Sequence, residues 1–277
     1  MVSTVTKTLM AAVVLSSISL TVTRTTYGDQ VIHVGSKDST TSVPLDRISH
    51  RSWTVLLSRY VNENGSVAYA SWKQSDTDRR QLSDYLKQLS SADLDVPSSP
   101  DDRMAFWINA YNALTIDGVL QHYPIKSIRD LASDSGGFNI WDDYQLYVDG
   151  KPFSLNQIEH EILRPMADSR IHFAIVCASK SCPALTREAY SGEKLDRQLS
   201  ADAKRFFEQP QNFVREKDSV SVSAILYWYR EDFGETEVEM IHRITPWLKP
   251  TSRLPIPDNE APIKFLEYDW SLNDSGF

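Results

Sequence analysis

The sequence predicts a single α+β domain that is mostly helical, with a small sheet and a buried central helix. Helix-period patterns outnumber the strand candidates, and most of the strand candidates fall in the second half of the chain. One segment near residues 100–122 is apolar around most of its circumference, which is typical of a buried helix. The 277 residues are 41% hydrophobic and 24% charged, close to ordinary globular usage and sufficient for one large core.

Apolar side chains recur at helical intervals in seven segments. Helices are expected at residues 46–60, 75–90, 100–122, 154–165, 192–208, 223–231 and 236–248. The central helix has the clearest start, because Ser99 can cap it, Pro100 suits its first turn and two acidic residues follow at the positive end of its dipole. Pro124 marks its end. The helix after it opens on the capping box Ser154-Leu-Asn-Gln157.

Extended segments are fewer and shorter than the helices. They are expected at residues 66–69, 144–153, 170–177, 219–223 and 264–268. The second of these is predicted to be a hairpin that turns at Asp149-Gly150. Residues 170–177 are apolar on both faces apart from His172, which predicts a central strand. The sequence Ser181-Cys-Pro183 then predicts the start of another helix.

The first 28 residues resemble an export signal. Lys7 precedes an apolar and small-residue stretch at 9–22 that is too short to span a bilayer, which indicates a signal peptide or, without cleavage, an anchor. Residues 29–45 are rich in Ser and Thr and predict a flexible leader, so the domain is expected to span 46–277. The expected location is periplasmic or extracellular, with membrane contact only through an uncleaved N-terminus.

The charge balance argues against a nucleic-acid partner. The chain has 29 basic and 37 acidic residues and a net charge of −8, whereas phosphate binding needs a basic face. Rossmann and P-loop fingerprints are absent from the sequence, and no cofactor is expected.

The two cysteines, Cys177 and Cys182, support two different interpretations. In an exported protein a local disulfide is the simpler one, since a four-residue loop can bring the two Cα atoms close enough. Alternatively, Cys182 is a nucleophile at the expected helix start. Free backbone N–H groups and the positive end of the helix dipole would favour its thiolate, and the same N–H groups could hold an oxyanion.

A thiol hydrolase also needs a base, and two histidines are candidates. On an extended strand His172 lies roughly 16 Å from Cys177, so a direct pair is not expected, and a core histidine bonded to backbone is the alternative. His160 lies off the apolar stripe of its helix and is expected to face solvent or a cleft. A zinc site formed by these histidines and the two cysteines is a weaker hypothesis, because the spacings match no common zinc pattern. No metal is therefore expected.

Three further polar residues occupy positions expected to be apolar. Glu159 falls inside the apolar stripe of its helix, so it is expected either to pair with Arg164 or Arg170 or to orient a catalytic imidazole. Asn109 and Asn112 share one face of the central helix. They are expected to bond to neighbouring backbone, although Asn109 could instead orient an imidazole, as an asparagine does in some cysteine hydrolases.

Several motifs resemble the DUF547 family, a domain of unknown function, over about residues 46–273. They are Phe106-Trp-Ile-Asn-Ala-Tyr-Asn-Ala113, Ile158-Glu-His-Glu-Ile-Leu-Arg164, Ile171-His-Phe-Ala-Ile-Val-Cys-Ala-Ser-Lys-Ser-Cys-Pro183, Trp228-Tyr-Arg-Glu-Asp-Phe-Gly234 and Tyr268-Asp-Trp-Ser-Leu-Asn273, with an opening motif from Trp53 to Tyr69. The resemblance implies an exported bacterial protein of unsettled activity. Its recurring polar and thiol residues are compatible with a papain-like or transglutaminase-like thiol hydrolase, although their order along the chain differs from that of papain.

The sequence therefore predicts an exported cysteine-dependent hydrolase that acts on peptide or amide bonds. In this hypothesis Cys182 attacks, His160 or His172 is the base, and Glu159 or Asn109 orients the imidazole. The alternative is a non-catalytic envelope module with a Cys177–Cys182 disulfide. Such a module would use its aromatic residues to bind a peptide or another envelope component.

Overall fold

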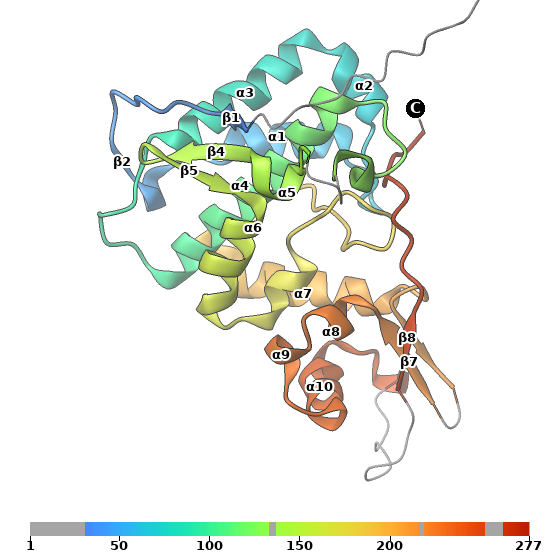
Figure 1. Ribbon diagram of the computed structural model, residues 1–277. Helices are drawn as coiled ribbons and strands as arrows, with labels where there is room; N and C mark the ends of the chain where they lie inside the picture. Colours follow the sequence, from blue (N-terminus) through green and yellow to red (C-terminus); the bar gives the residue numbers. More distant parts are fainter. Residues whose placement is uncertain (1–30, 133–136, 217–218, 253–262, 277) are drawn as a thin grey trace, which may run out of the picture.

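The computed structural model describes residues 31–132, 137–216, 219–252 and 263–276, and these form the predicted α+β domain. Figure 1 shows α1–α4 with one small sheet in the upper half, and α8–α10 with a second sheet in the lower half. The helices are α1 (Arg51–Tyr60), α2 (Tyr69–Gln74), α3 (Asp76–Ser90), α4 (Pro100–His122), α5 (Ile140–Asp143), α6 (Leu155–Gln157), α7 (Leu195–Glu208), α8 (Ile225–Trp228), α9 (Arg230–Phe233) and α10 (Glu237–Ile244). Short 3₁₀ turns join several of them.

The central helix α4 is confirmed, including its start. Ser99 caps it by accepting a 3.0 Å hydrogen bond from the backbone N–H of Asp102, and Pro100 occupies its first turn. Every residue from Met104 to Leu120 is buried, so the helix forms the axis of the larger hydrophobic core. A smaller core lies between α7, α8 and α10, with Phe173 among its members.

Three small sheets accompany the helices. Their strands are β1 (Ile32–Val34), β2 (Val43–Pro44), β3 (Ala92–Asp93), β4 (Tyr144–Val148), β5 (Lys151–Ser154), β6 (Phe213–Arg215), β7 (Val220–Ser223) and β8 (Ile263–Leu266). The predicted hairpin is β4–β5, and β1 adds to it as a parallel strand. The strands predicted at 219–223 and 264–268 are present as β7 and β8. In this C-terminal sheet β7 pairs antiparallel with β6 and parallel with β8.

The expected flexible leader is corrected by the structure. Within residues 29–45, strand β1 pairs with β4, and β2 pairs with β3. Apolar residues of β1 pack against the larger core, which supplies the free energy that orders this segment despite its polar composition. The predicted signal segment, residues 1–28, lies outside the described residues. None of the helices in the described ranges combines the length and hydropathy needed to cross a bilayer.

The predicted central strand at 170–177 and the helix predicted at Ser181 are both wrong. Residues Ser169–Phe173 form a 3₁₀ turn, and residues 174–191 run as an irregular segment between the two halves of the molecule (Figure 1). The side chain of Asn112 supplies hydrogen bonds that a neighbouring strand would otherwise provide to this buried backbone. Its amide donates to the Ala174 carbonyl at 2.9 Å and accepts from the Val176 N–H at 2.9 Å.

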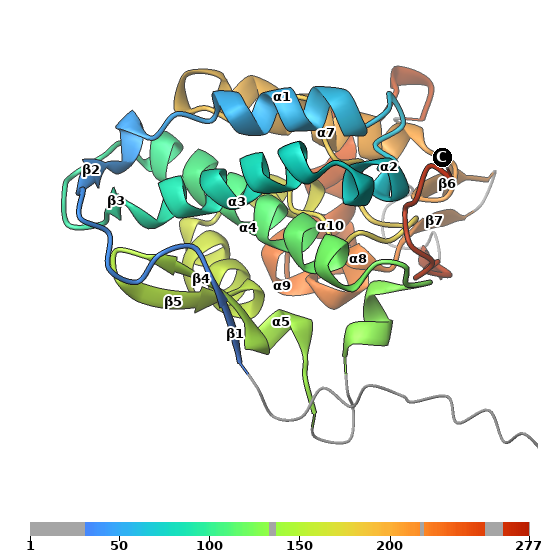
Figure 2. The same cartoon turned by 90° about the horizontal axis from the view of Figure 1, so that it is seen from above.

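The C-terminal segment folds back over this irregular segment. After β8 the chain forms backbone hydrogen bonds with two separate segments. The Leu272 N–H donates to the Lys126 carbonyl, and the Asn273 N–H donates to the Ala178 carbonyl. Figure 2 shows the segment beside α2, where Asp274 forms a bridge with Val67. This return path places the C-terminal aromatic residues over the two cysteines.

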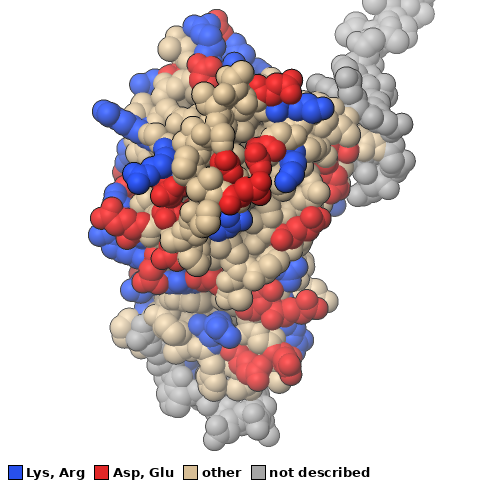
Figure 3. Space-filling model, turned by 90° about the vertical axis from the view of Figure 1, so that its left-hand side faces the viewer, with Lys and Arg blue, Asp and Glu red and all other residues tan. Residues whose placement is uncertain are grey.

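Acidic and basic side chains are intermixed on the surface. Figure 3 shows the face that forms the left-hand side of Figure 1, where red and blue groups lie next to one another between uncharged areas. This face therefore carries small groups of acidic and basic side chains side by side.

Candidate functional site

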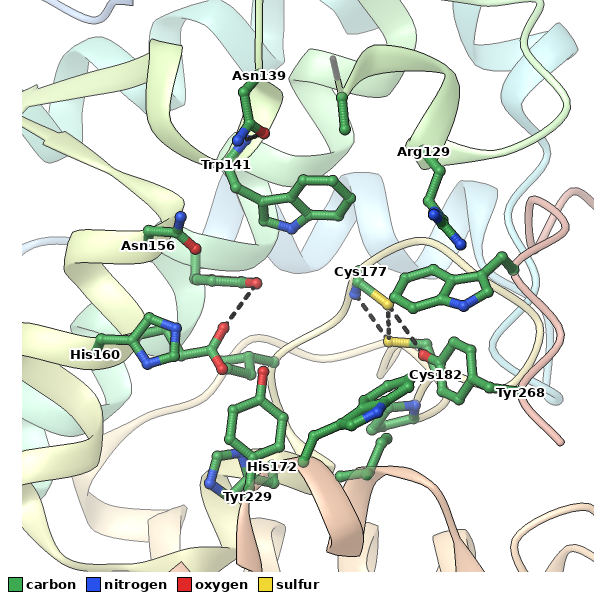
Figure 4. Close-up of a pocket in the computed structure, with 18 residues that line it drawn as sticks. Arg129, Asn139, Trp141, Asn156, His160, His172, Cys177, Cys182, Tyr229 and Tyr268 are labelled. Carbon is green, nitrogen blue, oxygen red and sulfur yellow. Dashed lines mark hydrogen bonds between the residues drawn. The ribbon is translucent and has the colours of Figure 1, made fainter. Parts of the chain in front are cut away.

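Four of the five predicted catalytic residues, together with Cys177, line one cavity of about 410 Å³. They are Glu159, His160, His172, Cys177 and Cys182. In Figure 4 the two cysteines lie with Tyr268 and Arg129 on one side of the cavity, and His160 and Asn156 lie on the opposite side. The predicted residue that does not line the cavity is Asn109. The cavity is therefore the candidate functional site.

The two cysteine sulfurs face each other at the cavity wall. They are not bonded, and Sγ of Cys177 lies 3.0 Å from Sγ of Cys182. The backbone N–H of Cys177 also donates to the Cys182 sulfur at 2.8 Å. Between them Ala178 has a φ of 58°, a left-handed conformation that costs energy for a residue with a Cβ. The loop thus holds a strained backbone while bringing the two thiols together.

The two thiols differ in acidity. The hydrogen bond from the Cys182 thiol lowers the pKa of Cys177 to about 7, against the opposing effect of burial. The hydroxyls of Ser179 and Tyr268, each 3.2 Å from the Cys177 sulfur, lower this pKa further. Burial and the hydrogen bond to Cys177 raise the pKa of Cys182. The hydrogen bonds around Cys177 therefore favour its thiolate over that of Cys182.

The structure removes the physical reason for choosing Cys182 as the nucleophile. No helix starts there, because α7 begins only at Leu195, so neither a helix dipole nor a row of free N–H groups acts on this sulfur. The direction of its pKa shift is also the opposite of the one expected. Sequence reasoning expected Cys182 to be the more acidic thiol, whereas the contacts in the structure favour the thiolate of Cys177.

His172 is buried, but its partner is a carboxylate and not the backbone. Its Nε2 lies 2.6 Å from Oδ2 of Asp232, and its ring stacks on Tyr229 with a centroid distance of 4.0 Å. Arg164 binds the same carboxylate through two hydrogen bonds of 2.7 and 3.1 Å. Burial alone would raise the pKa of Asp232, but the bonds from His172 and Arg164 bring it down to about 2. This cluster joins α9 to the wall of the cavity.

Replacing Asp232 with asparagine is expected to lower stability at pH 7 and to lower it less in acid. The folded-state pKa near 2 lies below the ~3.9 of an unfolded carboxyl. The carboxylate therefore stabilises the fold above about pH 4, and this contribution is lost as the pH falls toward 2. Urea unfolding at pH 7, 4 and 3 measures the effect, with the change Glu235→Gln at a nearby exposed position as control. A difference between wild type and Asp232→Asn that stays constant over this range would contradict it.

Glu159 is buried without the ion pair expected for it. Its Oε2 accepts a 3.1 Å hydrogen bond from the Tyr111 hydroxyl, and its Oε1 accepts none among the described residues. Arg164 pairs with Asp232, and Arg170 pairs elsewhere. The segment Ile158–Leu163 is a π-helix, a rare widened turn that is frequent at functional sites, and it presents Glu159 and the next residue to the cavity.

His160 faces outward at the mouth of the cavity, as predicted. Its Nδ1 lies 3.1 Å from Nη1 of Arg164. In the described part of the chain neither His160 nor His172 makes a hydrogen bond to a sulfur, because the imidazoles engage Arg164 and Asp232 instead. The cavity therefore brings together thiols and imidazoles without joining them as a catalytic dyad.

The two asparagines of α4 bond to backbone, as predicted. Asn109 donates to the Tyr190 carbonyl at 2.8 Å and accepts from the Tyr190 N–H at 3.0 Å, just as Asn112 does with residues 174 and 176. Both polar atoms of the Asn109 amide are thereby used. The structure gives it the place of a structural clamp and no contact with an imidazole among the described residues.

A family model described as "Protein of unknown function, DUF547" matches residues 97–207. This segment of the chain is similar to the DUF547 family. A search of curated proteins found no match, and a search of solved structures found none either. The matched DUF547 segment contains α4, the π-helix with Glu159, and both cysteines.

Sequence reasoning did not assign roles to several residues that line this cavity or bond to its lining residues. Asp232 and Tyr229 lie in the Trp228–Gly234 motif, and Tyr268 begins the Tyr268–Asn273 motif, so the signal that could have found them was their position in motifs already singled out. Tyr111 lies likewise between the two asparagines of α4. In the described ranges, no group of three or more His, Cys, Asp or Glu side chains is arranged to hold a metal ion.

Proposed function

We propose that this protein is a thiol–disulfide oxidoreductase in which Cys177 attacks and Cys182 resolves. The observation that carries the proposal is the 3.0 Å separation of two free sulfurs at the wall of a cavity. A disulfide needs an S–S distance of about 2.05 Å, so oxidation requires the sulfurs to approach by about 1 Å.

The contrasting acidities support this division of roles. Exchange requires an attacking thiolate, and a pKa near ambient pH is optimal because it combines ionisation with nucleophilicity. Cys177 has such a pKa, about 7. Cys182, with its raised pKa, stays protonated, and once Cys177 is ionised the Cys182 thiol, 3.0 Å away, is the donor that stabilises the thiolate.

The reaction balances without a metal or an added cofactor. The Cys177 thiolate attacks one sulfur of a substrate disulfide; the substrate S–S bond breaks, and the leaving thiolate takes a proton from solvent. Cys182 then loses its proton and attacks the Cys177 sulfur of the mixed disulfide, which releases the second substrate thiolate. The substrate is reduced by two electrons, the Cys177–Cys182 pair is oxidised, and an external dithiol would regenerate it.

The cysteine-dependent hydrolase predicted from the sequence remains a second candidate. It is favoured by Glu159 and His160, which line the same cavity as a thiolate with a pKa near 7. It is less well supported because no imidazole within the described ranges hydrogen-bonds to a sulfur, so the leaving amine of a peptide has no evident proton donor. The exported location expected from residues 1–28 would suit either activity, and it is part of this proposal.

One experiment tests the proposal against both alternatives. The reduced protein is mixed with bis(2-hydroxyethyl) disulfide, and its intact mass and released thiol are followed. We expect a loss of two hydrogens, a 177–182 disulfide and two thiols released per chain. In parallel, iodoacetamide labelling of Cys177 should rise with pH and reach half its maximum near pH 7, where its thiolate forms.

Three outcomes would contradict the oxidoreductase. Labelling that titrates near the ~8.5 of an ordinary thiol would remove the activated thiolate. Cleavage of peptide amide substrates with no change in protein mass would support the hydrolase. A 177–182 disulfide that is already complete in the isolated protein and resists reduction by small thiols would support the non-catalytic module.

A further inference from the structure

The Glu159 carboxyl group lies in the wall of the cavity with few partners. The residue is 5% exposed, accepts a hydrogen bond from Tyr111 and interacts with the Tyr229 hydroxyl, and it forms no salt bridge among the described residues. The nearby Arg164 is taken by Asp232 through two hydrogen bonds. A buried carboxylate normally needs a cationic partner or several hydrogen bonds, because desolvation is expensive. A cationic group of a bound ligand would supply the ion pair that Glu159 lacks.

Several aromatic rings line the cavity. The rings belong to Trp141, Trp228, Tyr229, Tyr268 and Trp270. Tyr229 already binds one cation, since the Arg164 guanidinium lies 5.5 Å from its ring centre. Burial raises the pKa of the Tyr229 hydroxyl, and the neighbouring Glu159 raises it further. Aromatic faces next to a carboxylate are the surroundings that bind an ammonium group best. The aromatic rings and Glu159 therefore both favour a positively charged ligand group at the Glu159 side of the cavity.

A positive charge lies at the other side of the cavity. The Arg129 guanidinium lies 5.4 Å from the ring centre of Trp270, and it forms no ion pair within the described residues. Figure 4 places Arg129 with the two cysteines, opposite His160, which follows Glu159 in the chain. Its planar fork is suited to a carboxylate. The thiol pair thus shares one side of the cavity with a site for an anion, and the site for a cation lies on the opposite side.

We infer that the cavity binds a disulfide whose halves carry both an ammonium and a carboxylate group, as cystine and short cysteine-peptide disulfides do. This inference rests on the proposed function and names its substrate class. Glu159 and the aromatic rings hold the ammonium group, Arg129 holds the carboxylate, and the substrate sulfur meets Cys177. The volume of about 410 Å³ falls in the range usual for small-molecule sites, about 300–1,000 Å³.

Four disulfides that differ only in charged groups test this inference. They are cystine (both charges), cystamine (ammonium only), 3,3′-dithiodipropionate (carboxylate only) and bis(2-hydroxyethyl) disulfide (neutral). Single-turnover oxidation of the full chain is measured with each, and each rate is divided by the rate of the same disulfide with free dithiothreitol. We expect cystine to exceed the neutral disulfide by about tenfold or more, as one satisfied charge pair would give.

Two variants assign the two charges. Glu159→Gln should slow cystine and cystamine by about tenfold and leave dithiodipropionate and the neutral disulfide unchanged. Arg129→Gln should slow the reactions of cystine and dithiodipropionate and leave those of cystamine and the neutral disulfide unchanged. The control changes Glu161→Gln and Lys126→Gln alter the same net charges at exposed positions outside the cavity lining and should alter no ratio. The unchanged neutral disulfide shows that each variant is folded and its thiols are intact.

The outcomes separate the inference from the function it rests on. Equal corrected rates for all four disulfides would overturn the inference and leave the oxidoreductase standing. A Glu159→Gln variant with unchanged rate ratios would also overturn it. A wild-type protein that reacts with none of the four would overturn the proposed function itself, and the substrate class with it.

Discussion

Replacing Cys177 with serine is expected to abolish disulfide exchange, whereas Cys182→Ala should stop the reaction half-way. A serine hydroxyl at 177 cannot provide the thiolate that forms near pH 7, so the rate should fall by roughly 10³-fold or more. Without the thiol at 182 the first attack still proceeds, but nothing resolves the mixed disulfide. Intact mass should show the substrate half attached to Cys177 in Cys182→Ala and no adduct in Cys177→Ser.

The Cys182→Ala variant carries a second expected result. The hydrogen bond from Cys182 is the largest influence that lowers the pKa of Cys177, so its loss should raise that pKa. The pH midpoint of Cys177 alkylation should then move upward from about 7. An unchanged midpoint would mean that Ser179 and Tyr268 alone set the acidity. An adduct on Cys182 in the Cys177→Ser variant would reverse the assigned roles.

Replacing Asn112 with alanine is expected to destabilise the protein by about 2–5 kcal/mol and to disturb the thiol pair. The change leaves the Ala174 carbonyl and the Val176 N–H without partners in the core, and each such buried group costs about 1–3 kcal/mol. Because these two groups directly precede Cys177, the loop should lose its defined geometry. Urea unfolding measures the free energy, and alkylation of the reduced protein reports the pKa of Cys177.

Asn109→Ala is the matched control for this second prediction. Asn109 makes the same two hydrogen bonds, but with Tyr190, away from the cysteines. Its loss should cost a comparable free energy while leaving the alkylation midpoint in place. A shift of equal size in both variants would show that general loosening, and not the clamp on residues 174 and 176, disturbs the thiols.

Elements whose patterns are local were predicted well. The central helix carries its own cap, a proline in its first turn and an apolar surface on all sides, so short-range physics is enough to define it. The capping box at Ser154 and the hairpin at Asp149-Gly150 are equally local signals, and both are present in the structure. The amides of Asn109 and Asn112 also followed from burial alone, because a buried amide must find partners.

The segment around the cysteines could not be predicted in the same way. Residues 170–177 have the apolar composition of a central strand, and local rules cannot distinguish a strand from irregular backbone that is buried by its neighbours. Asn112, some 62 positions earlier in the sequence than Ala174, supplies the hydrogen bonds that a sheet would have supplied. Apolar strands such as β1 were missed for the related reason that their partner β4 lies far along the chain.

The amino-acid sequence by itself determined the fold class, the central helix, the motifs that resemble the DUF547 family and five of the side chains that line the cavity. Only the tertiary structure decided which sulfur is the stronger acid, that the imidazoles bond to Arg164 and Asp232, and that Glu159 lacks an ion pair. The physical reason is that acidity and pairing depend on donors within a few ångströms. Tyr268 and Asp232 reach the site from segments that are distant in the chain and meet it only when the cores pack.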